Sequence, residues 1–175
     1  MGGAKVPLYH RVTHATCPSQ RGPGAPGPPS CATPPPPSSV CCTSDSDCDG
    51  GSNGRCLNGG RAGTRCTYDE CFSDSNCPSG TPCICRTSSA DNASNACVTG
   101  SRCVIDSDCG PSSYCSPSPA PSQYGCQGPG PYFCHTASDA CIDDADCFVD
   151  GGGGFFCAYD PQAHRWGCTP QFCPP

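Results

Sequence analysis

The chain has 175 residues, a net charge of −6 and a single lysine, so it lacks the basic surface that nucleic-acid binding requires. It contains 22 cysteines, 22 glycines and 22 prolines but few aliphatic residues, and no apolar run reaches the roughly 18 residues of a membrane span. Disulfides, at about 2–4 kcal/mol each, are therefore expected to replace a conventional core. So many cysteines are typical of an extracellular or otherwise oxidising compartment, and we predict a secreted protein.

Residues 1–40 form a Pro/Gly-rich N-terminal arm. The first twenty residues lack the apolar stretch of a signal peptide, so we expect the numbered chain to begin inside a longer precursor or at a start that is not the native one. Cys17 and Cys31 bracket the Gly/Pro run, which is therefore expected to be pinned. Consecutive prolines favour an extended polyproline II rod, and here they are Pro34, Pro35, Pro36 and Pro37.

The rest of the chain contains four tandem cysteine-rich units, called repeats 1 to 4, at 41–70, 71–102, 103–140 and 141–175. Each begins with two cysteines separated by five residues in the pattern Cys-x-x-Asp-x-Asp/Asn-Cys. The repeat length of roughly 30–38 residues is typical of repeat arrays. We call the stretch between these two cysteines the acidic loop. The cysteines predicted to form the disulfides of the repeats are Cys42, Cys48, Cys56 and Cys66; Cys71, Cys77, Cys83 and Cys97; Cys103, Cys109, Cys115 and Cys126; and Cys141, Cys147, Cys157 and Cys168.

The final cysteines of repeats 3 and 4 are chosen by local similarity. Cys126 and Cys168 each follow an aromatic–Gly step and lie eleven positions after the preceding cysteine of the repeat. Cys173 follows Cys168 as Cys71 follows Cys66, so it is interpreted as the stub of a further unit. Four cysteines allow three pairings, and the spacing does not choose among them. The cysteines outside the fourfold set are Cys17, Cys31, Cys41, Cys85, Cys134 and Cys173.

Secondary structure is expected to be sparse. Gly-Gly, Asn-Gly and Pro-Gly steps predict turns between short strands, and no window shows helical periodicity. The predicted fold class is small and disulfide-rich: an elongated tandem array of short, loop-rich, cysteine-stapled units with minimal β-hairpins and an extended Pro-rich N-terminal arm. Aromatic residues beside the cysteines are expected to pack on the disulfides as miniature cores.

Two resemblances suggest functions. The spacing Cys71-x5-Cys77-x5-Cys83-x-Cys85, with acidic residues in the first gap, resembles extracellular modules of the whey-acidic-protein and Dickkopf type over about two thirds of the chain. That resemblance implies a secreted inhibitor of proteases or an antagonist of signalling. The tracts "PPPPSS" and "SPSPAPS" are similar to the Ser/Pro tracts of hydroxyproline-rich matrix glycoproteins, which implies a glycosylated structural protein.

The acidic loop of repeat 1 also looks like half of a calcium site. Asp45, Asp47 and Asp49 place oxygens at alternating positions before Gly50, but position 56 is a cysteine where a calcium loop has its bidentate glutamate. The other repeats keep at most two of these acidic positions. Aspartate in such a place more often caps a turn by accepting backbone N–H bonds. We therefore interpret the loops as structural, with calcium as the alternative and no other cofactor expected.

Sugars are predicted at two kinds of position. Asn92 opens the sequon Asn-Ala-Ser in a polar stretch between cysteines, the usual setting of an N-glycosylated surface loop. The Ser/Pro tracts predict O-linked sugars and sugars on hydroxylated proline. The candidates are Ser38, Ser39, Ser116 and Ser118 for O-linked sugars, and Pro34, Pro35, Pro36 and Pro37 for hydroxyproline-linked sugars.

The sequence contains no catalytic constellation. Its four histidines stand singly in polar surroundings, and the paired Cys-x2-Cys spacing of zinc sites does not occur. We expect neither catalytic residues nor enzyme activity. The predicted function is a structural subunit of an extracellular fibril, cell wall or matrix, self-assembling with copies of itself and carrying glycans. The alternative is a secreted disulfide-rich protease inhibitor or ligand-binding module.

Overall fold

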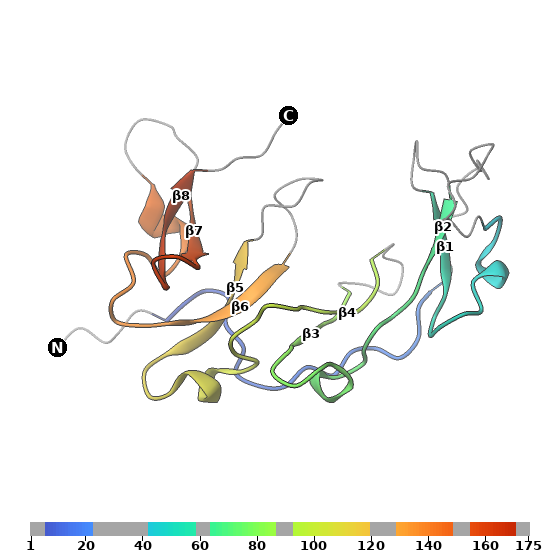
Figure 1. Ribbon diagram of the computed structural model, residues 1–175, viewed down its shortest axis with the longest axis horizontal. Helices are drawn as coiled ribbons and strands as arrows, with labels where there is room; N and C mark the ends of the chain where they lie inside the picture. The colour runs from blue at the N-terminus through green and yellow to red at the C-terminus, as the bar shows by residue number, and fades with distance from the viewer. Residues whose placement is uncertain are drawn as a thin grey trace. The chain divides into compact units, whose positions relative to one another are not determined.

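The computed structural model describes residues 6–22, 42–58, 64–86, 93–119, 129–148 and 155–170. Their regular structure consists of four antiparallel two-stranded hairpins, one in each repeat (Figure 1). The strands are β1 (Arg55–Asn58), β2 (Thr64–Thr67), β3 (Cys83–Ile84), β4 (Ala96–Cys97), β5 (Tyr114–Pro119), β6 (Pro129–His135), β7 (Phe155–Asp160) and β8 (Arg165–Pro170). The acidic loops contain short 3-10 turns: η1 (Asp45–Asp47), η3 (Asp74–Asn76), η4 (Asp106–Cys109) and η5 (Asp144–Cys147).

The predicted fold class is confirmed as a small disulfide-rich fold of loop-rich tandem units with short hairpins. Within the described ranges, no helix has the length and apolar character needed to cross a membrane. The polyproline prediction at 34–37, and the predictions for Cys31, Cys41 and Cys173, lie outside the described residues.

All four repeats carry the same two disulfides. The first cysteine bonds to the third, and the second bonds to the fourth. The third and fourth cysteines face each other across the hairpin, so both bonds fasten the acidic loop onto the strands. These disulfides are Cys42–Cys56 and Cys48–Cys66, Cys71–Cys83 and Cys77–Cys97, Cys103–Cys115 and Cys109–Cys134, and Cys141–Cys157 and Cys147–Cys168.

Repeat 3 corrects one sequence assignment. Its fourth cysteine is Cys134, which bonds to Cys109, and not Cys126 as predicted from local similarity. The pairing of the strands explains this choice. Cys134 lies opposite Cys115 in the β5–β6 hairpin, as the fourth cysteine lies opposite the third in the other repeats. Cys126 itself lies outside the described residues. A local Gly-Cys match could not reveal which cysteine the returning strand carries.

The chain divides into two compact units. The first lobe comprises 15–77 and 83–97, and the second lobe comprises 1–14, 78–82 and 98–175. In the first lobe the core consists of sulfur: Cys17, Cys71 and Cys83 are buried together. A ninth disulfide, Cys17–Cys85, attaches the N-terminal segment to repeat 2, and Cys17 N donates to Phe72 O at 2.7 Å beside it.

The core of the second lobe combines sulfur with aromatic rings. Trp166 is 2% exposed and lies against the buried cysteines of repeat 4, with Phe133, Phe155 and Tyr159 around it. The rings of Phe133 and Tyr159 stack with centroids 3.8 Å apart, which joins the β5–β6 hairpin to the β7–β8 hairpin. The prediction that aromatic side chains pack on the disulfides is confirmed for these four residues.

Candidate functional site

The two polar residues of each acidic loop have the same roles in all four repeats. The first accepts the N–H of the third cysteine at 2.8–2.9 Å, and the second accepts the N–H groups of the two residues after the first cysteine at 2.7–3.1 Å. The first set is Asp45, Asp74, Asp106 and Asp144, and the second is Asp47, Asn76, Asp108 and Asp146. The turn-capping interpretation is confirmed. Since the neutral amide of Asn76 serves at the second position of repeat 2, that position requires an acceptor oxygen and not a negative charge.

Of the three calcium candidates, Asp45 and Asp47 accept backbone N–H groups in the acidic loop. Asp45 also pairs with Arg55 at 3.0 Å, and hydrogen bonds from Thr43 hold the pKa of Asp47 below its usual range. Asp49 is exposed. Any calcium ion here would compete with backbone donors for the oxygens of two of its three ligands, and calcium binding stays a prediction.

We expect Asp45→Ala to lower the free energy of unfolding by about 1–3 kcal/mol, because the N–H of Cys56 loses its acceptor. Asp45→Asn keeps an acceptor oxygen and should lose less. Asp49→Ala, directly after the same loop, should lie within about 0.5 kcal/mol of the wild type. Denaturant unfolding with intact disulfides measures all three. Equal losses in the two alanine variants would contradict the capping role.

The first lobe has a fully buried ion pair. The side chains of Arg86 and Asp69 are both 0% exposed and bonded to each other. Asp69 also accepts bonds from Asn53 Nδ2 at 2.7 Å and from Asn95 N at 2.8 Å. Burial raises the pKa of Asp69, but these hydrogen bonds and the charge of Arg86 hold it below its usual range. The second guanidinium nitrogen of Arg86 donates to the backbone carbonyls of Pro18 and Gln20. The ion pair therefore holds residues 18–20 in place.

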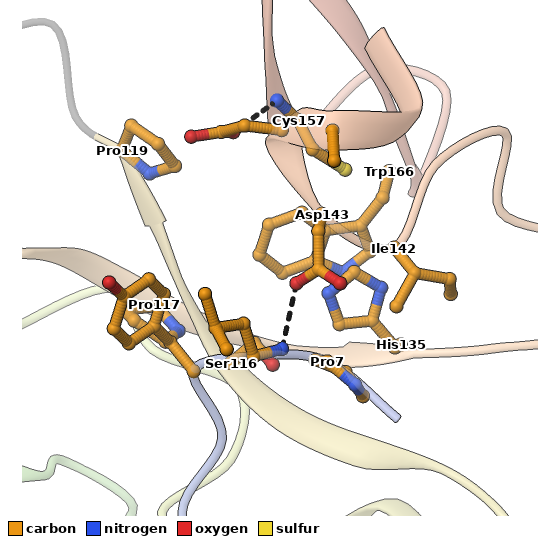
Figure 2. A pocket seen from close by; sticks show the side chains of 13 residues that line it. Pro7, Ser116, Pro117, Pro119, His135, Ile142, Asp143, Cys157 and Trp166 are labelled. Carbon is orange, nitrogen blue, oxygen red and sulfur yellow. Dashed lines mark hydrogen bonds between the residues drawn. The ribbon is translucent and has the colours of Figure 1, made fainter. Parts of the chain in front are cut away.

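A cavity of about 310 Å³ lies in the second lobe, and Figure 2 shows side chains that line it, among them Pro7 near the N-terminus. Its walls come from residues 7–9, from the strands β5, β6, β7 and β8, and from the acidic loop of repeat 4. Most of the lining is apolar, and its polar members are few. The polar lining residues include Ser116, His135, Asp143 and Asp144, and Leu8 and Trp166 belong to the apolar part.

His135 is the most buried titratable group of this cavity. It is 2% exposed, and its ring stacks on Trp166 with centroids 4.0 Å apart. Its Nδ1 lies 3.1 Å from Asp139 Oδ2, and the same carboxylate accepts the backbone N–H groups of Thr136 and Trp166. Because Asp139 acts as an acceptor throughout, this hydrogen-bond network assigns the imidazole proton to Nδ1. Nε2 is then left as an acceptor.

Two serines of β5 behave differently although both are buried. Ser118 Oγ accepts the N–H of Tyr159 at 3.0 Å. Ser116 is 3% exposed, and its Oγ has no hydrogen-bond partner among the described residues. Both serines are buried, so neither hydroxyl is presented at the protein surface to a glycosyltransferase, and the predicted O-linked sites at Ser116 and Ser118 are corrected. The candidates Ser38, Ser39, Asn92 and Pro34–Pro37 lie outside the described residues.

Ser116, His135 and Asp139 are the residue types of a hydrolytic triad. In such a triad the serine hydroxyl bonds to the imidazole, whereas Ser116 Oγ makes no such bond within the described structure. From the sequence, His135 is interpreted as an isolated polar residue. Its burial could have been inferred from the alternation around Cys134, because residues two apart in a strand share a face and Phe133 therefore lies on the same face as His135.

Acidification should destabilise the second lobe through His135. Burial lowers the pKa of His135, against the opposing effect of Asp139 and Asp143. The unfolded chain therefore takes up this proton first, and stability is lost as the pH falls below about 6.5. Thermal unfolding between pH 7.5 and 5 should show this loss, and His135→Gln should reduce it. His164→Asn removes an exposed imidazole and should not; equal slopes in the two variants would contradict this assignment.

Comparison with known proteins shows no family for the chain, because no family model, no curated protein and no solved structure matches it. The likeness to whey-acidic-protein and Dickkopf-type modules therefore remains a resemblance in cysteine spacing. The structure supports the coarser description of tandem disulfide-rich repeats.

Proposed function

We propose that the protein is a secreted structural subunit that associates with copies of itself in an extracellular fibril, wall or matrix. The observation that carries this proposal is a strip of exposed apolar side chains at residues 6–12. Within seven residues, Val6, Leu8, Tyr9 and Val12 are 48%, 72%, 72% and 66% exposed. Clustered exposed apolar side chains mark interaction surfaces in soluble proteins.

The backbone of this strip is anchored to the second lobe. Arg11 N donates to Cys115 O at 2.9 Å, and Asp106 N donates back to Arg11 O at 2.7 Å. Leu8 N donates to Asp143 Oδ1 at 2.7 Å, and His10 pairs with Asp106 at 2.7 Å. A strip already ordered in the free protein loses little conformational entropy on association. That favours contact between copies.

The disulfides support the extracellular setting, because bonds of this number persist in oxidising compartments. N-linked sugar at Asn92 and sugars on Ser38, Ser39 and Pro34–Pro37 remain part of the proposal, and no catalytic role belongs to it. Repeated cross-linking also suits a protein that must keep its shape outside the cell.

Sedimentation velocity and electron microscopy test self-association directly. We expect concentration-dependent assembly of the wild type and loss of assembly in Val6→Ser/Val12→Ser. Phe148→Ser is the matched control, because Phe148 is 75% exposed in the same lobe but outside the strip. A wild type that stays monomeric at millimolar concentration, or equal loss in the control, would overturn the proposal.

The second candidate function is a secreted ligand-binding module. The cavity beside His135 favours it, since a structural subunit has no need of one. A monomer that binds a small molecule would support this candidate over the first.

A further inference from the structure

We propose that the cavity of the second lobe binds a small apolar molecule that carries a hydrogen-bond donor, in the class of substituted phenols. The cavity volume of about 310 Å³ is near the lower limit of small-molecule sites. It is roughly twice that of an engineered 150 Å³ cavity that holds benzene. A one-ring or two-ring molecule therefore fits. This inference does not depend on self-association.

The polar lining explains why the ligand should donate. His135 offers Nε2 as an acceptor, and Asp143 and Asp144 contribute carboxylates. None of the described lining residues is a lysine or arginine, so an anionic ligand would meet negative charge without compensation. A neutral O–H or N–H group would find acceptors, and an aromatic or aliphatic body would meet the prolines and Trp166.

Ser116 is the independent indication of a ligand. A buried hydroxyl without a partner is costly, and such a group in a native protein calls for a missing partner. Ser118, two residues along the same strand, is equally buried but bonded to Tyr159 N. The β5 strand can therefore satisfy a serine at this depth, and it leaves unsatisfied the serine that lines the cavity. A ligand oxygen or nitrogen would complete the hydrogen bonding of Ser116.

The first test uses the single tryptophan of the chain. Trp166 lines the cavity, so its fluorescence should change saturably as 4-propylphenol is added. The control ligand, 4-propylanisole, differs only by a methyl group on the oxygen, which removes the donor. We expect its affinity to be at least tenfold lower. No saturable change with the phenol, or equal affinity for the two ligands, would overturn the proposal.

The second test separates a ligand contact from a structural role. Ser116→Ala should fold with unchanged or higher stability, because it removes an unsatisfied group, yet bind 4-propylphenol about tenfold more weakly. Ser118→Ala should lose stability and keep its phenol affinity. Undiminished affinity in Ser116→Ala would show that the hydroxyl does not face a ligand. Repeating the titration in Val6→Ser/Val12→Ser separates this result from self-association, because neither side chain lines the cavity.

Discussion

Replacing Arg86 by methionine is expected to lower the free energy of unfolding of the first lobe by about 3–5 kcal/mol. The substitution leaves the carboxylate of Asp69 buried at 0% exposure without its cation. It also leaves the carbonyls of 18 and 20 without their donor. Methionine retains much of the volume, so the loss reports charge and hydrogen bonding more than packing.

The control for Arg86→Met is Arg65→Met, because Arg65 is exposed in the same lobe. Its expected effect is within about 0.5 kcal/mol. Amide hydrogen exchange at Asn95 gives a local readout, since that N–H donates to Asp69 Oδ1 at 2.8 Å. Fast exchange at Asn95 in Arg86→Met but not in Arg65→Met is the expected pattern. Full protection in both variants would show that the ion pair does not hold the lobe together.

The acidic loops were predictable because their pattern is local. The Asp-x-Asp/Asn pattern occurs four times at the same offsets from cysteines, which predicted a structural role. These offsets place each acceptor oxygen within reach of backbone N–H groups a few residues away. The disulfide pairing was not predictable, because three pairings fit the spacing. The choice depends on which cysteines face each other in a hairpin, and the assignment of Cys126 shows how a local match fails when a long connection precedes the returning strand.

The two buried centres were missed for a different reason. Arg86 and Asp69 are seventeen residues apart and each looks like an ordinary surface residue in the sequence. His135 and Ser116 share one face of the β5–β6 hairpin, but they become buried only because Trp166 and Tyr159 of another hairpin cover that face. Contacts between hairpins have no periodic signature in the sequence, whereas capping within a loop does.

Removing disulfides from repeat 4 tests whether sulfur serves as core or only as cross-link. Cys141–Cys157 and Cys147–Cys168 have sequence separations of 16 and 21, so the loss of loop entropy alone costs about 3 kcal/mol for either bond, slightly more for the second. Their burial differs. Cys141 and Cys157 are both buried against Trp166, whereas in the second pair Cys147 is buried in the same cluster and Cys168 is exposed.

We therefore expect Cys141→Ala/Cys157→Ala to lose more stability than Cys147→Ala/Cys168→Ala, by about 1 kcal/mol, because the first pair vacates two buried positions beside Trp166 and the second pair only one. Denaturant unfolding followed by Trp166 fluorescence measures both in the same repeat. Equal losses, or a larger loss in the second pair, would mean that these disulfides act through the unfolded chain alone. In that case the aromatic rings, and not the sulfur atoms, would form the core of the second lobe.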